Sequence, residues 1–110
     1  MTEMTATELA ALQTLLETLR EENEADLANA KATMAALAAD HSAIDPALHE
    51  VAANAEYMIE DASSILAQIA AATERIAAGT YGICISCGQP IALARLELRP
   101  YVATCIACAA

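Results

Sequence analysis

Apolar side chains recur at alternating spacings of three and four residues along two long stretches of the chain, residues 5–39 and 46–78. This spacing puts the side chains in one stripe on an α-helix, so both stretches are predicted to be amphipathic helices. The second stretch keeps the pattern over four heptads, which is typical of a coiled-coil seam. Its seam positions are Leu48, Val51, Ala55, Met58, Ala62, Ile65, Ile69, Ala72 and Ile76.

The first stretch carries a matching stripe, interrupted once by the polar residue Asn23. A single antiparallel register pairs the two stripes over nearly their whole length, starting with Leu37 opposite Leu48. We therefore expect a mainly α fold, with a long antiparallel two-helix coiled-coil hairpin over residues 1–78 and its tip at 40–46. An ordinary helical bundle, or a parallel dimer of the second helix, is the alternative. The first stripe consists of Leu9, Leu12, Leu16, Leu19, Leu27, Ala30, Met34 and Leu37.

Start and stop signals mark the ends of both predicted helices. Thr5 followed by Glu8 fits a capping box, in which the hydroxyl and the carboxylate satisfy N–H groups of the first turn. Asp45 before Pro46 suits the start of the second helix, because Asp caps and Pro is favoured at the first helical position. Gly79 suits its end.

The composition changes at Gly79: all four cysteines and all three glycines lie from this residue onward. The cysteines form two C-x-x-C pairs separated by 17 residues, and four thiolates complete a tetrahedral Zn²⁺ site. A thioredoxin-like redox pair and an iron–sulfur cluster are the alternatives. We expect one structural Zn²⁺ in a small C-terminal four-cysteine zinc finger over 79–110. Its expected ligands are Cys84, Cys87, Cys105 and Cys108.

Four protein ligands leave no position for water or substrate, so we expect no zinc catalysis and no enzyme. The metal would instead hold together a segment that has too little core to fold alone. The three tyrosines of the chain are expected to be packing groups. The core of the finger is expected to consist of Ile83, Ile85, Ile91, Leu93, Leu96, Val102 and Ile106.

The net charge of −10 excludes several classes of partner. Proteins that grip phosphates need clustered Lys and Arg, whereas this chain has one lysine, Lys31, and four arginines. The same charge disfavours anionic membranes, and no apolar run reaches the roughly 20 residues needed to span a bilayer. The acidic start of the chain does not have the pattern of a signal peptide. We therefore expect a cytoplasmic protein with no direct contact with nucleic acid or membrane.

The stretch GTYGICISCGQPIALARLELRPYVATCIAC resembles the zinc-finger signature of the DksA/TraR family of bacterial transcription regulators. The matching features are the G-x-Y-G-x-C-x-x-C-G opening, Ile91, Arg95-Leu96, Arg99-Pro100 and the closing C-x-x-C. The predicted hairpin extends the resemblance to most of the chain. The resemblance implies a non-enzymatic regulator that binds RNA polymerase and inserts the coiled-coil tip into the secondary channel to modulate initiation.

The tip sequence of this family, D-x-x-D-x-A, is half preserved. Asp45 and Ala47 match its second Asp and its Ala, whereas Ser42 takes the place of the first Asp, with Asp40 two residues away. Asp45 is explained equally well as a helix N-cap, and one residue can serve both roles.

Two arginines of the finger are candidate contacts for polymerase or nucleotide. Family members that respond to guanosine tetraphosphate use basic residues near the finger; Arg99 matches one of these, but Gln68 and Ala109 replace two lysines. We therefore expect a weak response to this nucleotide or none. Arg95 either binds a polymerase carboxylate or braces the finger against the hairpin base, and we favour bracing.

A second hypothesis needs no tip chemistry. A zinc-stapled coiled coil can act as an adaptor or structural protein without polymerase activity. Apolar positions off the seam, such as Ile59 and Leu66, would then support association with another protein or with itself. Under the leading hypothesis we expect a monomer.

Overall fold

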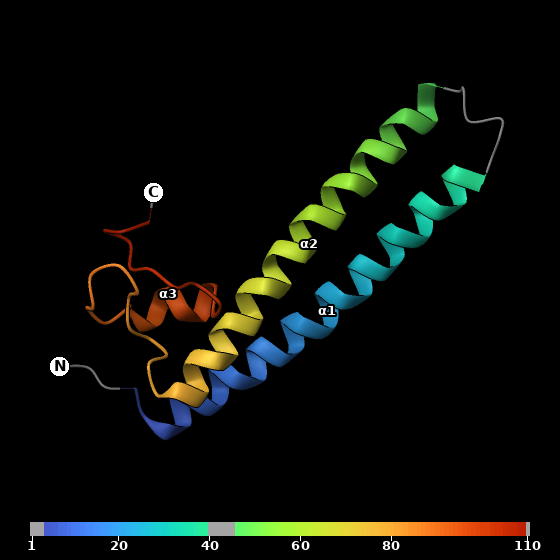
Figure 1. Cartoon of the computed structure of the whole chain (residues 1–110). Coiled ribbons are helices and arrows are strands. Elements are labelled where there is room, and N and C mark those ends of the chain that lie inside the picture. The colour runs from blue at the N-terminus through green and yellow to red at the C-terminus, as the bar shows by residue number, and fades with distance from the viewer. Residues whose placement is uncertain (1–3, 40–45, 110) are drawn as a thin grey trace. The chain divides into compact units, whose positions relative to one another are not determined.

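The fold of the chain is mainly helical, as predicted. The computed structural model describes residues 4–39 and 46–109, in which two long helices pack together (Figure 1). Within these residues there is no strand, and none of the helices is long and apolar enough to cross a membrane. The helices are α1 (Ala6–Ala39), α2 (Pro46–Ala78) and the short α3 (Leu93–Leu98).

The chain divides into two compact units. Unit 1 combines Met1–Arg20 with Ala67–Ala110, so it contains the start of α1, the end of α2 and the cysteine-rich segment. Unit 2 is Glu21–Leu66, the remainder of the two long helices and their connection. The predicted division into a hairpin over 1–78 and a finger over 79–110 stays a prediction.

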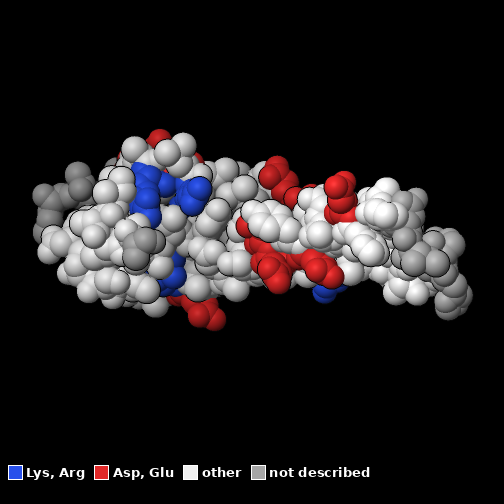
Figure 2. Space-filling view, turned by 90° about the horizontal axis from the view of Figure 1, so that it is seen from above, with Lys and Arg blue, Asp and Glu red and all other residues white. Residues whose placement is uncertain are grey.

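The two units differ sharply in charge (Figure 2). The segment of unit 2 holds ten of the fifteen acidic residues and one of the five basic residues, a formal charge of −9 out of −10. The segments of unit 1 are close to neutral. The acidity that the composition showed for the whole chain is therefore a property of one part of it.

Local hydrogen bonds confirm the predicted start of α1 and the predicted end of α2. The Thr5 N–H donates to Glu8 Oε1 at 2.9 Å and the Glu8 N–H donates to Thr5 Oγ1 at 3.1 Å, which is the expected capping box. At the end of α2, Gly79 has a φ of +78°. The Thr80 N–H donates to the Arg75 carbonyl at 2.9 Å, as in a Schellman motif.

The predicted seam is mostly buried. Every stripe position of α1 is buried or half-buried, and so are seven of the nine seam positions of α2. The prediction was wrong for Val51 and Met58, which are 45% and 37% exposed. We attribute this to the buried alanines Ala30 and Ala55: small side chains let helices approach closely, so longer neighbours extend to the edge of the interface.

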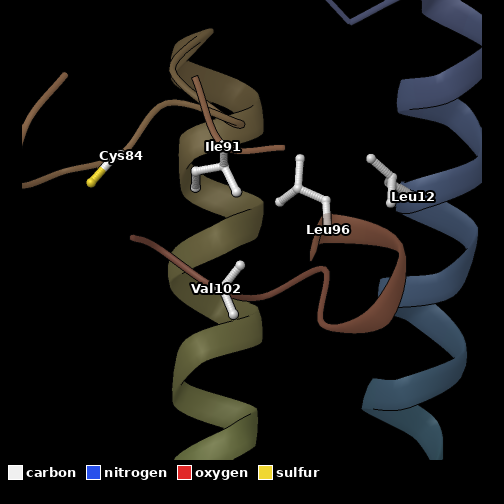
Figure 3. Packing of buried hydrophobic residues seen from close by; sticks show 5 residues of the cluster. All are labelled: Leu12, Cys84, Ile91, Leu96 and Val102. Carbon is white, nitrogen blue, oxygen red and sulfur yellow. The ribbon is translucent and has the colours of Figure 1, made fainter. Parts of the chain in front are cut away.

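The hydrophobic core of unit 1 is shared between the finger and α1 (Figure 3). Its buried members are Leu12, Cys84, Ile91, Leu96 and Val102. Leu12 comes from α1, whereas the other four come from the cysteine-rich segment. This segment therefore completes its core with a side chain from the long helix.

Three residues of the predicted finger core lie outside it. Ile83, Ile85 and Ile106 are 40%, 68% and 77% exposed, so the prediction was wrong for them. Ile85 and Ile106 each follow the first cysteine of a C-x-x-C pair. Because the two sulfurs of such a turn face the metal site, the residues between them point outward.

We predict that the shared core stabilises unit 1. Leu12→Ala removes a side chain that is 3% exposed, and it should lower the free energy of unfolding by about 2–5 kcal/mol. The matched control is Leu98→Ala, which truncates a leucine that is 84% exposed and should change the free energy by less than about 0.5 kcal/mol. Urea unfolding of the zinc-loaded chain measures both. Equal effects of the two substitutions would show that Leu12 is not part of a shared core.

Candidate metal centre

The four cysteine sulfurs converge on one point. Their Sγ atoms all lie within 4.8 Å of one another, and Cys87 Sγ is 3.6 Å from Cys105 Sγ. A tetrahedron with Zn–S bonds of about 2.3 Å has edges of about 3.8 Å, so this spacing fits one Zn²⁺ ion. A disulfide would need the two sulfurs at about 2.05 Å. The four cysteines are therefore positioned to bind one metal ion, as predicted.

The two C-x-x-C pairs lie in similar turns. The Gly88 N–H donates to the Cys84 carbonyl at 2.9 Å, and the Ala109 N–H donates to the Cys105 carbonyl at 3.0 Å. Gly88 has a φ of +75°, which L side chains rarely adopt, so glycine suits this turn. The Ile85 N–H also donates to the Ala103 carbonyl at 2.9 Å, which ties the first turn to the segment that leads into the second.

Backbone amides favour the thiolate of Cys84. The Cys105 N–H, aimed at the Cys84 sulfur, is the largest of the influences that lower the pKa of Cys84 to about 6, and the amides of Cys87 and Ser86 add to it. The neighbouring thiols, Cys105 first, raise the pKa of Cys108 to about 12. Four thiolates thus repel one another at this distance, and a divalent cation supplies the positive charge that lets all four ionise.

A second layer of side chains holds the backbone that leads into Cys105. Residues 100–104 form no strand, yet alternate carbonyls of this segment accept a hydrogen bond from a side chain. The bonds are Tyr81 Oη to Pro100 O at 2.7 Å, Arg75 Nη2 to Val102 O at 3.4 Å, and Arg95 Nε to Thr104 O at 3.0 Å. These donors come from α2, α3 and the loop between them, so three parts of unit 1 position the second cysteine pair.

Burial raises the pKa of Tyr81 to about 12, so its hydroxyl stays protonated and keeps donating at any physiological pH.

The predicted contact residues outside the metal centre differ in their surroundings. Arg95 is half-buried, whereas the Arg99 side chain is exposed and makes no hydrogen bond to any residue that the structure describes. Of the predicted tip residues, Ala47 is exposed in the first turn of α2. Asp40, Ser42 and Asp45 lie outside the described residues. A role of these residues in binding polymerase or nucleotide stays a prediction.

Two comparisons place the chain among known proteins. The family model described as the prokaryotic dksA/traR C4-type zinc finger matches residues 79–110, which contain the metal centre. The solved structure of transcription factor DksA2 from Pseudomonas aeruginosa is similar along 94% of this chain and 81% of that chain, with 30% sequence identity and a TM-score of 0.81. No curated protein matches the chain in sequence.

We predict that Arg95 strengthens metal binding although it is no ligand. Arg95→Met keeps an unbranched side chain but removes the donor to Thr104, and residues that support metal ligands typically change affinity by about 10–100-fold. We therefore expect zinc affinity to fall by about tenfold, as measured by competition with a chromogenic chelator. Arg99→Met is the matched control and should leave the affinity nearly unchanged. A similar loss for both variants would indicate a general effect of charge rather than the hydrogen bond.

Proposed function

Because the chain belongs to the DksA/TraR family of zinc-finger transcription regulators, we propose that it regulates transcription by binding bacterial RNA polymerase. The observation that carries this proposal is the extent of the structural similarity. It covers 94% of the chain, with both long helices as well as the finger, and the similar protein is a transcription factor. Zinc fingers occur in proteins of many functions, so a finger alone indicates little about function. Its combination with this hairpin is much more specific evidence.

The metal centre supports a structural role rather than catalysis. When Zn²⁺ is bound, it supplies folding free energy to the finger, and four thiolate ligands leave it no open coordination position. Contacts of the protein then attach the finger to the long helices: Leu12 of α1 packs in its core, and Arg75 of α2 donates a hydrogen bond to it. We propose that the protein is not an enzyme.

We propose that the tip of the hairpin, residues 40–46, enters the secondary channel of the polymerase and modulates initiation there. Asp45 is the proposed functional carboxylate, with Ala47 beside it and with Ser42 and Asp40 as weaker candidates. The charge of −9 on the segment of unit 2 supports a protein partner, since a surface of this sign repels the phosphates of DNA and RNA. We further propose a cytoplasmic monomer that responds weakly or not at all to guanosine tetraphosphate.

We predict that Asp45→Asn separates the function of the tip from its role as a helix cap. Asn caps helices about as well as Asp, so the stability of the protein should stay unchanged while the charge is lost. The zinc-loaded variant should bind core RNA polymerase like wild type but lose most of the effect on initiation in transcription reactions. Asp26→Asn is the control, because it makes the same change of charge at an exposed position of α1. This variant should affect initiation like wild type.

Two results would count against this proposal. If wild-type chain does not bind polymerase at micromolar concentration, the proposed function is wrong and the adaptor hypothesis gains support. If it binds, but Asp45→Asn regulates initiation like wild type, the carboxylate of Asp45 is not the functional group of the tip.

A further inference from the structure

Part of α2 within unit 2 displays large apolar side chains to solvent. Tyr57 is 66% exposed, although the tyrosines were expected to be packing groups. Val51 and Met58, two seam positions, are 45% and 37% exposed. The chain has only three aromatic residues, all of them Tyr, with which to fill its core. It is therefore unusual that one of them is exposed beside partly exposed apolar side chains. Such a group of side chains is typical of a contact surface for another molecule.

These side chains lie next to one another on the helix. Successive residues of an α-helix turn by about 100°, so Val51, Asn54 and Met58 form one row and Tyr57 lies beside it. Within the row, Asn54 Nδ2 is 3.9 Å from Met58 Sδ. Exposed carboxylates border the group at both ends, Glu50 on the N-terminal side and Asp61 on the C-terminal side. We call these six residues the α2 patch.

The layout of the α2 patch is that of a protein-binding surface. Recognition surfaces commonly have an apolar centre with an aromatic anchor and a polar rim. Here Tyr57 is the exposed aromatic anchor, Val51 and Met58 are the apolar side chains on the other side of Asn54, and Glu50 and Asp61 form the rim. No ion pair joins either of these two carboxylates to a residue in the described part of the chain, so their charge is available to a partner.

Charge decides which partner fits. The segment of unit 2 carries a formal charge of −9, with Lys31 as its single basic residue. A second copy of this segment would bring the same charge, so contact between two α2 patches is opposed by like-charge repulsion. DNA, RNA and anionic membranes are disfavoured for the same reason. A basic protein surface is the occupant of complementary charge.

We propose that the α2 patch docks on a protein surface that has an apolar depression bordered by Lys and Arg. The inference rests on the proposed function, because we take RNA polymerase to be the protein that presents this surface. Tyr57 fills the depression and contributes most of the binding free energy, since buried aromatic anchors dominate such contacts. Glu50 and Asp61 pair with the basic border and mainly steer association, so their contribution falls as salt rises.

The test measures binding of zinc-loaded full-length chain to core RNA polymerase at low and at high salt. Tyr57→Ala should weaken binding by about tenfold or more at both salt concentrations, through faster dissociation. Asp61→Asn should slow association at low salt and make binding less dependent on salt. Both side chains are exposed, so neither substitution should alter the fold, and circular dichroism verifies this.

Two variants serve as matched controls. Glu56→Gln removes one negative charge next to Tyr57 in sequence but on the opposite side of α2, about 160° from Asn54. Leu98→Ala truncates an exposed apolar side chain in unit 1. Both variants should bind polymerase like wild type.

The possible results separate this inference from the proposed function. If wild type binds and Tyr57→Ala and Asp61→Asn bind like the controls, the α2 patch is not the contact and only this inference is overturned. If wild type does not bind, the proposed function is overturned and this inference with it. If sedimentation shows a dimer of wild type that Tyr57→Ala abolishes, the patch pairs with a second copy, and the proposed basic partner is wrong.

Discussion

The convergence of four cysteine sulfurs on one point is the constraint on which the structure of unit 1 depends. Sulfurs within 4.8 Å of one another cannot all ionise without a cation between them, and the segment that carries them has little regular secondary structure. Over its described residues, 79–109, this structure is one helix of six residues and an isolated bridge between Ile83 and Pro90. A bound Zn²⁺ therefore fixes the two turns, and the fixed turns let Ile91, Leu96 and Val102 close over Leu12.

The two units divide the work between them. Unit 1 combines the metal centre, the shared core and the side-chain donors that hold residues 100–104, and its charge is nearly balanced. Unit 2 has no metal ligand in its described residues, a seam built largely on small side chains, and almost all of the net charge. The metal centre thus belongs to unit 1 and the charge to unit 2, which is the division that the proposed contact with a large protein uses.

Local signals predicted much of this fold. The Thr5–Glu8 pair, Pro46 and Gly79 marked helix ends correctly, because caps and turns depend on neighbouring residues alone. The metal centre was predicted from the number and spacing of the cysteines, because two C-x-x-C pairs supply the four thiolates of a structural zinc site. Contacts between distant segments could not be predicted in this way. Nothing in the sequence indicated that Leu12 would join the core of the finger, or that Arg75 would donate to the carbonyl of Val102. Ile85 and Ile106 were predicted to be buried because they are hydrophobic. They are exposed because the geometry of the C-x-x-C turns points them outward.

The most direct test of the account is the protection of the finger from trypsin, which cleaves after Arg95 but not after Arg99, because Pro100 follows it. With zinc bound, at one ion per chain, the bond after Arg95 should resist cleavage. Removal of the metal with a chelator at neutral pH should expose the Arg95 site quickly, while most of the helical circular dichroism signal persists. One equivalent of Zn²⁺ should restore protection. Equal resistance of the metal-free and zinc-loaded chains would contradict the claim that the four cysteines and their ion organise this part of the protein.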